Sequence, residues 1–354
     1  MHHHHHHGGS GKTPNPGRIS PGLYLLLGIL VSACAPREAT VGLLLYNESD
    51  PYIMEFARQI MDEAGTSLEI TKLDAGNSQL IQNEQIGRLL DAKPDLLMIN
   101  PVDRLGAYAI IRRLQAEDVP VIFFNREPLA NDLSIWDQTY YVGAKAEQSG
   151  QMQASLVMDL FGGDPDALNL YDRNKDGIIQ TIVLKGEQGH QDAEIRTREV
   201  LRSFESMGLP VEVLALEVAN WNRDEAYEKM GRLLGSFSSQ VELVVSNNDA
   251  MALGAISRMR QADMFKDTNG NGRLDREDES WIPVVGIDGL REAEESIHDG
   301  YLYGTVKNDS LSMAKAMVEL TAALLSGRDP ESLAYPLVAG KYIWIDYQPF
   351  VSQD

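Results

Sequence analysis

The sequence predicts two doubly wound α/β domains, each with a parallel sheet covered by helices on both faces. Strand-like apolar runs alternate with amphipathic helical segments along most of the chain. The apolar runs are continuous, as expected of strands that are buried on both faces. Without a terminal tag and leader, about 320 residues remain, which is too long for one ordinary core and suits two domains.

The first half of the chain begins with a strand over 41–46. A helix over 51–65 follows, because its apolar residues recur at helical spacing. The same alternation continues to residue 161. We expect strands at 68–75, 95–100, 119–125 and 140–143, and helices at 78–92, 106–118 and 146–161.

The second half repeats the pattern after residue 161. Its apolar runs are again continuous, and amphipathic segments such as 192–208 separate them. Repeated strand–helix units of this kind predict a second doubly wound sheet. We expect strands at 181–187, 211–218, 241–247, 282–288 and 303–308.

The N-terminus carries segments that do not belong to the fold. Residues 1–11 are a polyhistidine tag with a linker, and they are excluded from fold reasoning. Residues 12–33 have two basic residues followed by an apolar run over 23–31, which is typical of a signal peptide. That run is too short to span a bilayer comfortably.

The end of this leader, Val31 to Cys34, resembles a bacterial lipobox. The resemblance implies cleavage before Cys34, a lipid on its thiol, and a linker over 34–40. The alternative is an ordinary buried or unused cysteine. Since Cys34 is the only cysteine, no disulfide can form within one chain.

Composition excludes several function classes. The formal net charge of −21 and the pI near 4.7 argue against nucleic-acid binding, which needs a basic face. Outside the tag only His190 and His298 remain, which are too few histidines for a multi-histidine metal site. No phosphate-binding loop, dinucleotide fingerprint or nucleophile elbow occurs. We therefore expect a protein that is not an enzyme.

Polar side chains follow most of the predicted strands. In open α/β sheets, ligands bind beyond the carboxyl ends of the strands. The set combines carboxylates and amides with one Arg, one His and two aromatic rings. Planar polar groups pair with vicinal hydroxyls, and aromatic faces cover the C–H patches of a sugar ring. The candidate binding residues are Asp50, Tyr52, Asn100, His190, Asp192, Arg196, Trp221, Asn248, Asp288 and Asn308.

Each of these residues also has a plainer interpretation. Asp and Asn after strands are common helix caps and turn formers. Arg196 fits a surface ion pair, Trp221 a core aromatic and His190 a helix cap. The joint occurrence at so many strand ends is what favours a binding site.

The stretch "DRNKDG" begins like an EF-hand calcium loop. Asp172, Asn174 and Asp176 alternate, and Gly177 follows at the position of the sharp turn. An EF-hand then needs a Glu at position 12, where this chain has Val183 inside a strand-like run. Either the last carboxylate comes from elsewhere in the chain, or the stretch is an Asx-rich turn without a metal.

A second acidic loop lies within "KDTNGNGRLDREDE". An apolar Leu274 and a sharp-turn Gly272 sit where calcium loops place such residues. The alternative is a solvated acidic surface turn. The candidate ligands of a second Ca²⁺ are Asp267, Asn269, Asn271, Arg273, Asp275 and Asp278.

Several segments resemble the bacterial galactose/glucose-binding proteins, which are type I periplasmic binding proteins of sugar ABC transporters. They include "LKGEQGHQDAEIRT", "SNNDAMALGA", "GIDGL" and "GTVKND". The likeness runs from about Val41 to the C-terminus, with an insertion near 263–280. It implies two Rossmann-like lobes joined by a hinge. The N-terminal lobe would comprise 41–146 and about 310–343, and the C-terminal lobe about 147–309 and 344–354, with the calcium loops.

The resemblance implies that the chain binds D-galactose or D-glucose between its lobes and delivers it to an ABC permease. The alternative is a sugar-sensing partner of a chemoreceptor or sensor kinase. The ten candidate binding residues fall where the family's sugar contacts lie, with Tyr52 at a position where Phe is familiar. It further implies an extracytoplasmic monomer held at the membrane only by its lipid.

The same resemblance implies a structural Ca²⁺. Family members complete the half-loop with one Glu from a distant strand. The implied ligands are Asp172, Asn174, Asp176, the backbone carbonyl of Ile178, Gln180 and Glu242.

Overall fold

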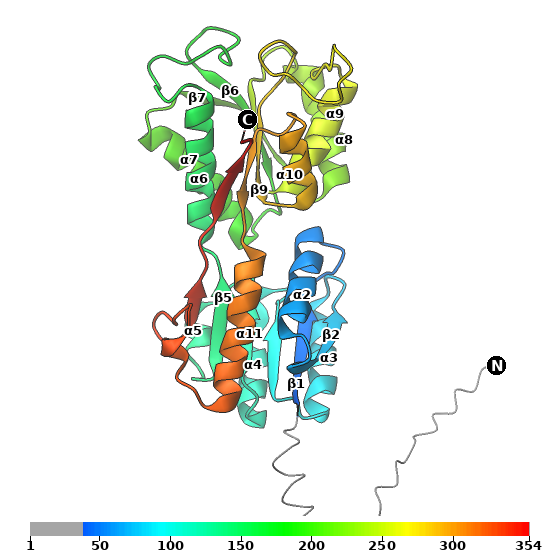
Figure 1. Ribbon diagram of the computed structural model, residues 1–354, viewed down its shortest axis with the longest axis vertical. Helices are drawn as coiled ribbons and strands as arrows, with labels where there is room; N and C mark the ends of the chain where they lie inside the picture. The colour runs from blue at the N-terminus through cyan, green and yellow to red at the C-terminus, as the bar shows by residue number, and fades with distance from the viewer. Residues whose placement is uncertain (1–37, 354) are drawn as a thin grey trace, which may run out of the picture.

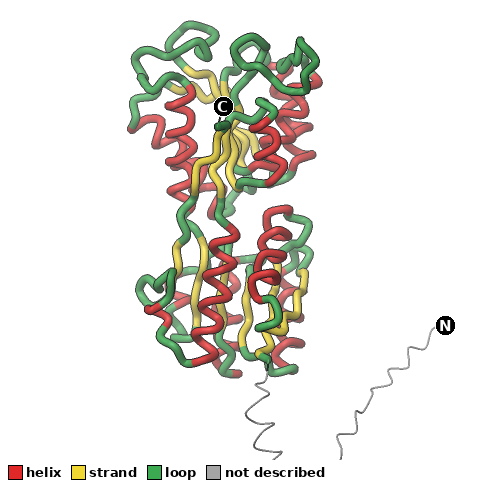
Figure 2. Tube along the Cα trace, in the orientation of Figure 1, coloured by secondary structure: helices red, strands yellow, loops and turns green. Residues whose placement is uncertain are grey.

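A computed structural model describes residues 38–353 and shows two α/β lobes, one above the other (Figure 1). The tag, the leader and Cys34 lie outside this range. Within residues 38–353, none of the helices combines the length and the apolar character needed to cross a membrane. The predicted fold class, two parallel-sheet lobes with helices on their faces, is confirmed (Figure 2).

The lower lobe of Figure 1 holds a fully parallel six-stranded sheet in the order β11-β5-β4-β3-β1-β2. Its strands are β1 (Ala39–Leu45), β2 (Leu68–Asp74), β3 (Leu96–Ile99), β4 (Val121–Phe124), β5 (Thr139–Gly143) and β11 (Tyr342–Trp344). Its helices are α2 (Pro51–Ala64), α3 (Gln79–Asp91), α4 (Ala107–Glu117), the short α5 (Ala130–Leu133) and α11 (Ser310–Ser326).

The upper lobe repeats the arrangement in the order β12-β10-β9-β8-β6-β7, with only β12 antiparallel. Its strands are β6 (Ile179–Lys185), β7 (Val211–Val218), β8 (Leu243–Ser246), β9 (Val284–Asp288), β10 (Gly304–Lys307) and β12 (Gln348–Val351). Its helices are α6 (Ala146–Leu160), α7 (Gln191–Ser206), α8 (Arg223–Phe237), α9 (Asp249–Gln261) and α10 (Arg291–His298).

Both faces of the lower sheet are covered by apolar side chains. On β1, Leu43 and Leu45 pack into one cluster while Leu44 packs into another on the opposite face. This explains why the central strands read as continuous apolar runs. The edge strands β2 and β7 alternate or are half-exposed, because each has a neighbour on one side only.

The chain passes between the lobes three times. It crosses from β5 into α6, from β10 into α11, and from β11 into β12 (Figure 1). Helix α11 returns to the lower lobe, where it packs against α2. Three short connections of this kind allow the lobes to move about a common hinge.

Candidate functional site

The carboxyl ends of strands from both sheets meet at a cleft between the lobes. A cavity of about 470 Å³ lies there, which is within the usual range for small-molecule sites. A second, smaller pocket of about 40 Å³, which we call the inner pocket, shares several lining residues with this cavity, and all the predicted binding residues except Asn100 line it. The inner pocket is lined by Tyr46, Asp50, Tyr52, Asn125, Arg126, His190, Asp192, Arg196, Trp221, Asn248, Asp288 and Asn308.

Asp50 has two roles on the lower wall of the cleft. As the N-cap of α2, its Oδ1 accepts the N–H groups of Tyr52 (2.9 Å) and Ile53 (3.4 Å). Its Oδ2 accepts the hydroxyl of Tyr46. The carboxylate is therefore held in place without a ligand. The cap also explains why an Asp stands directly before α2.

Asn100 does not line the pockets of the cleft, and its predicted ligand contact stays a prediction. It is fully buried, its Oδ1 accepts the N–H of Tyr46 (3.1 Å), and its Nδ2 donates to the carbonyl of Phe124 (3.3 Å). Both ends of its amide are thus used by neighbouring strand ends. Residues 46 and 125 stand in front of it and line the inner pocket instead.

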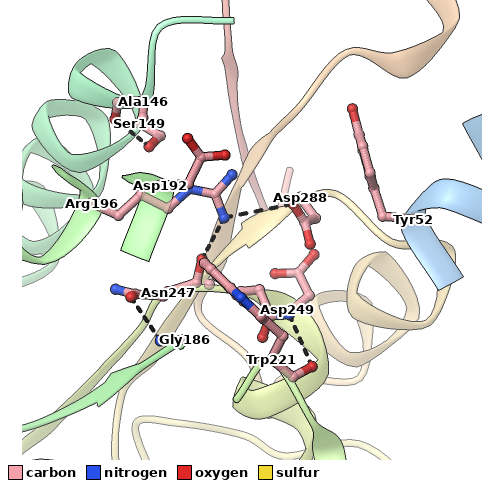
Figure 3. A network of polar contacts seen from close by, with 12 residues as sticks. Tyr52, Ala146, Ser149, Gly186, Asp192, Arg196, Trp221, Asn247, Asp249 and Asp288 are labelled. Atoms are coloured by element: carbon pink, nitrogen blue, oxygen red, sulfur yellow. Dashed lines mark hydrogen bonds and ion pairs between the residues drawn. The ribbon is translucent and has the colours of Figure 1, made fainter. Parts of the chain in front are cut away.

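Arg196 is the centre of the upper wall. Its side chain is buried, and it donates to the carbonyl of Asn247 (2.8 Å) and to the hydroxyl of Tyr347 (3.4 Å). Its Nη1 lies 4.0 Å from Oδ1 of Asp288 (Figure 3). A buried guanidinium needs such partners because its desolvation is costly. The expectation of a surface ion pair is replaced by a buried network at the cleft.

Two polar atoms of the inner cleft lack a partner. Within the described residues, Nε of Arg196 and Oδ1 of Asn308 are buried without a hydrogen bond. Both residues line the inner pocket. Buried polar atoms are nearly always hydrogen-bonded, so a donor and an acceptor left over here indicate a polar ligand.

Trp221 forms an aromatic wall above the cleft. Its ring meets that of His190 edge-on, with centroids 5.2 Å apart. A Cβ at residue 186 would come within 2.4 Å of the indole, so the glycine there allows the ring its close approach to β6. Tyr52 faces the cleft from the other lobe (Figure 3). Two aromatic rings therefore border the same cavity from opposite sides.

Burial shifts the ionisation of several cleft groups. It raises the pKa of Asp288 well above its usual range, while the nearby Arg196 charge acts in the opposite direction. It raises the pKa of Asp249 to about 6. Burial, together with the cations of Arg126 and Arg196, lowers the pKa of His190 to about 4, against the raising effect of Asp192. His190 is therefore neutral at pH 7.

The His190 shift predicts a loss of stability in acid. The unfolded imidazole binds a proton near pH 6.5, whereas the folded one does so only near pH 4. Stability therefore falls as the pH drops through this window, by up to about 3 kcal/mol for this group. His190→Asn keeps a cap acceptor for α7, and denaturant melts should show its stability relative to wild type rising between pH 6.5 and 4.

Asp249 acts in the opposite direction, since its raised pKa removes stability as the pH rises through 4 to 6. For this reason the comparison between wild type and His190→Asn, and not the wild-type curve alone, isolates the histidine. A difference that stays constant over pH 4 to 6.5 would contradict the burial of a neutral imidazole.

Three residues of the inner pocket are not among those predicted from the strand ends: Tyr46, Asn125 and Arg126. The guanidinium of Arg126 stacks 3.7 Å from the Tyr46 ring centroid and donates to the carbonyl of Val102 (2.7 Å). The strand-end rule could have found them, because Tyr46 ends one predicted strand and Asn125 another.

The predicted calcium half-loop gathers carboxylates at the far end of the upper lobe. Asp172, Asp176 and Glu242 each bring one oxygen within 4.8 Å of the others. Gly177 makes the sharp turn with φ +73°, and its N–H donates to Asp172 Oδ2 (2.9 Å). Glu242 thus comes from the segment before β8 to complete the loop.

The donor set fits a hard divalent cation. Glu242 is only 1% exposed, and Oδ1 of Asp172 is buried without a partner in the described part of the chain. Burial raises the pKa of Glu242, and the Asp172 charge adds to the rise. Three carboxylates held together in this way repel one another unless a cation lies between them. Asn174 and Gln180 lie beside the cluster, where their side chains hydrogen-bond each other (3.0 Å).

The two adjacent acids at the end of the second acidic loop differ in burial. Asp278 is exposed, while Glu279 is 7% exposed and accepts the N–H groups of Asp275 (2.8 Å) and Thr268. A helical turn, in which the Glu279 N–H donates to the Asp275 carbonyl, rotates residue 278 outward. Asp278 therefore lies in the solvent while Glu279 faces the loop, and the ligand role of Asp278 stays a prediction.

The rest of that loop is held by internal bonds. Asn269 and Asn271 both donate to the carboxylate of Asp275, and Gly272 donates to Asp267. Among the described residues, the three-carboxylate grouping occurs only at the first loop. Leu274 is buried in the core of the upper lobe, so the loop is anchored to the fold by its apolar residue.

Residues 41–329 match the profile of the periplasmic binding protein domain. The chain is a periplasmic binding protein. It is 35% identical over 300 residues to the D-galactose/methyl-galactoside binding periplasmic protein MglB of Haemophilus influenzae, covering 84% of this chain and 85% of that protein. It is 26% identical over 314 residues to a xylitol-binding protein of Mycolicibacterium smegmatis, covering 86% and 79%.

Solved structures show that this binding protein shares its fold with several solute-binding proteins. One from Bacillus halodurans with bound myo-inositol matches with a TM-score of 0.70 at 24% identity, covering 89% of this chain and 94% of that chain. One from Actinobacillus succinogenes with bound D-allose matches with a TM-score of 0.73 at 16% identity, covering 89% and 98%.

Proposed function

We propose that this protein binds D-galactose or D-glucose between its lobes and delivers it to the permease of an ABC importer. The observation that carries the proposal is the cleft itself, where planar polar side chains lie between an aromatic ring from each lobe. The 35% identical relative is named for D-galactose and methyl-galactoside binding. One other relative is named for xylitol binding, and two proteins of the same fold hold myo-inositol and D-allose, which supports a polyhydroxylated ligand.

The chemistry of the cleft suits a neutral pyranose. Tyr52 and Trp221 both line the cavity, from opposite lobes. Their aromatic rings would pack against the two faces of the sugar ring. Asp50, Asp288 and Arg196 would bond the hydroxyls at the ring edge by charge-assisted hydrogen bonds. The unpaired Nε of Arg196 and Oδ1 of Asn308 would gain partners.

Delivery would depend on closure of the lobes. The polar residues belong to both lobes, so a bound sugar connects them and favours the closed state. The three crossings supply the hinge. A membrane permease would then distinguish the closed, loaded form from the open one.

A ligand panel tests this proposal. D-galactose, D-glucose, D-ribose, D-xylose, L-arabinose and myo-inositol would be titrated calorimetrically into the purified protein. We expect the two hexoses to bind at least ~10-fold more tightly than the pentoses, because the pentoses lack the exocyclic hydroxymethyl group. Tighter binding of inositol or a pentose would overturn the assignment of the ligand class.

Trp221→Ala should weaken hexose binding by about 10-fold, which corresponds to ~1–1.5 kcal/mol for a lost aromatic contact. Trp281→Phe is the matched control, because Trp281 is buried in the upper lobe away from the cleft. Calorimetry should show a changed Kd for the first variant only. An unchanged Kd for Trp221→Ala would exclude the stacking role.

We also propose that the half-loop holds a structural Ca²⁺. Asp172, Asp176 and Glu242 would supply carboxylate oxygens, while Asn174, Gln180 and the carbonyl of Ile178 would supply neutral ones. Six or seven oxygen ligands suit Ca²⁺. The ion would tie the loop before β6 to the segment before β8, and would take no part in sugar binding.

The cellular setting forms part of the proposal. The protein would lie outside the cytoplasm, anchored through a lipid on Cys34 and acting as a monomer. Intact-mass measurement after expression with the native leader should show cleavage before Cys34 and the added lipid. Release of an unlipidated protein of the same length would argue against the anchor.

A further inference from the structure

We infer that Asp249 is a positioning residue, whose carboxylate holds the turn that carries Asp288 and thereby sets the affinity of the cleft. Asp249 lines neither the cavity nor the inner pocket, although both its neighbours, Asn248 and Ala250, line the cavity. Its expected effect on binding therefore comes through Asp288. The inference deepens the proposed function and rests on it for the identity of the ligand.

The carboxylate of Asp249 joins three elements: α9, the turn after β9, and β10. It is fully buried at the first residue of α9. Its Oδ2 accepts the N–H groups of Gly289 (2.8 Å) and Leu290 (2.9 Å), which follow Asp288 directly. Its Oδ1 accepts the hydroxyl of Thr305 on β10 (2.7 Å). Oδ2 thus holds the turn, while Oδ1 ties the carboxylate to β10.

The turn needs such a restraint because its backbone is unusual. Asp288 has φ +131°, a conformation that L-residues rarely adopt, and Gly289 follows with φ +78°. A residue in a sparsely populated conformation persists only when its surroundings fix it. The two hydrogen bonds to Asp249 come from the two amides next to Asp288, so they oppose relaxation of its backbone.

The neighbouring strand is shaped to receive this carboxylate. A Cβ at Gly286 would lie 2.2 Å from Oδ1 of Asp249, so any side chain there would displace it. The resulting geometry points the Asp288 carboxylate into the cleft, 4.0 Å from Arg196. If the turn relaxed, Asp288 would leave both the ligand and its buried counter-charge.

The test compares Asp249→Ser with Asp249→Asn. Serine fits the start of a helix but is too short to reach the turn, so hexose affinity measured by calorimetry should fall at least ~10-fold. Asparagine keeps an acceptor oxygen at the same distance, and its affinity should stay within ~3-fold of wild type. Met259→Ala, in the core of the same helix, should lower the melting temperature and leave the affinity unchanged.

A merely structural role is separated from positioning by coupling to Asp288. In an Asp288→Asn background the Asp249→Ser change should weaken binding little further, while its effect on the melting temperature persists. A full additional ~10-fold loss in that background, or wild-type affinity of Asp249→Ser alone, would overturn the inference.

Amide hydrogen exchange gives a readout that needs no ligand. The amides of residues 289 and 290 should be protected in wild type and exchange at least ~10-fold faster in Asp249→Ser. If wild type binds none of the sugars but this difference in exchange is present, the proposed function fails and the positioning role of Asp249 stands. If wild type binds hexoses and the exchange rates are equal, only the positioning role fails.

Discussion

Arg196→Met should abolish measurable hexose binding and lower the free energy of unfolding by about 3–5 kcal/mol. Methionine matches the length of the arginine stem but removes the charge. It leaves Asp288 buried without its counter-charge, and Asn247 and Tyr347 without a donor. Loss of a charged partner leaves the full desolvation cost of the groups that remain. We expect an affinity loss of more than ~100-fold.

Arg202→Met provides the matched control for this change. Arg202 lies on the same helix, but its side chain is 65% exposed and its pair with Glu199 spans 3.4 Å at the surface. Exposed pairs contribute little, so neither the Kd nor the melting temperature should move appreciably. Calorimetry and thermal melts on both variants check the prediction. Retained hexose binding by Arg196→Met would mean that the buried network has no role in recognition.

Removal of Ca²⁺ should produce the second large effect. An ion bound only by the folded state stabilises it by about 2.7–4 kcal/mol when present at 100 to 1,000 times its Kd. EDTA should therefore lower the melting temperature by several degrees, and added Ca²⁺ should restore it. Glu242→Gln removes one of the three clustered carboxylates, so it should weaken calcium binding and shrink the response to EDTA.

Sugar affinity serves as the internal control for the metal. The cluster lies at the opposite end of the lobe's strands from the cleft, so calcium-loaded Glu242→Gln should bind hexoses as wild type does. Asp275→Asn alters the second loop without touching the first cluster. A stoichiometry of one Ca²⁺ in wild type, unchanged in Asp275→Asn, is expected. A melting temperature insensitive to EDTA would show that the half-loop is only a turn.

The local patterns of the chain predicted most of the fold. The predicted strand at 95–100 contains the central strand β3. Its apolar run is continuous because side chains on both faces of the sheet are buried. Polar residues at strand ends came together in one cleft, because parallel strands share one carboxyl edge. Asp50 and His190 do cap helices, as the plainer interpretation of such residues has it, and both also line the inner pocket.

Such local patterns do not predict contacts between segments that are far apart in the sequence. The strand-end rule places Asn100 correctly at the edge of the sheet, but it does not say which side chain stands in front. Tyr46 and Asn125 occupy that place, and the guanidinium of Arg126 stacks on the Tyr46 ring. Asp278 and Glu279 are adjacent acids, and only the helical turn decides which one faces the loop.

The sequence by itself determined the strand and helix periods, the acidic character, the polar strand ends and the two loop motifs, since these depend on neighbours within a few residues. The tertiary structure alone decided how Asp249 reaches the turn after β9, 40 residues away, and how Arg196 meets Asp288. Such contacts depend on the order of the strands in the sheet and on which side chains become buried and desolvated next to each other. Neither is encoded in any single stretch of the chain.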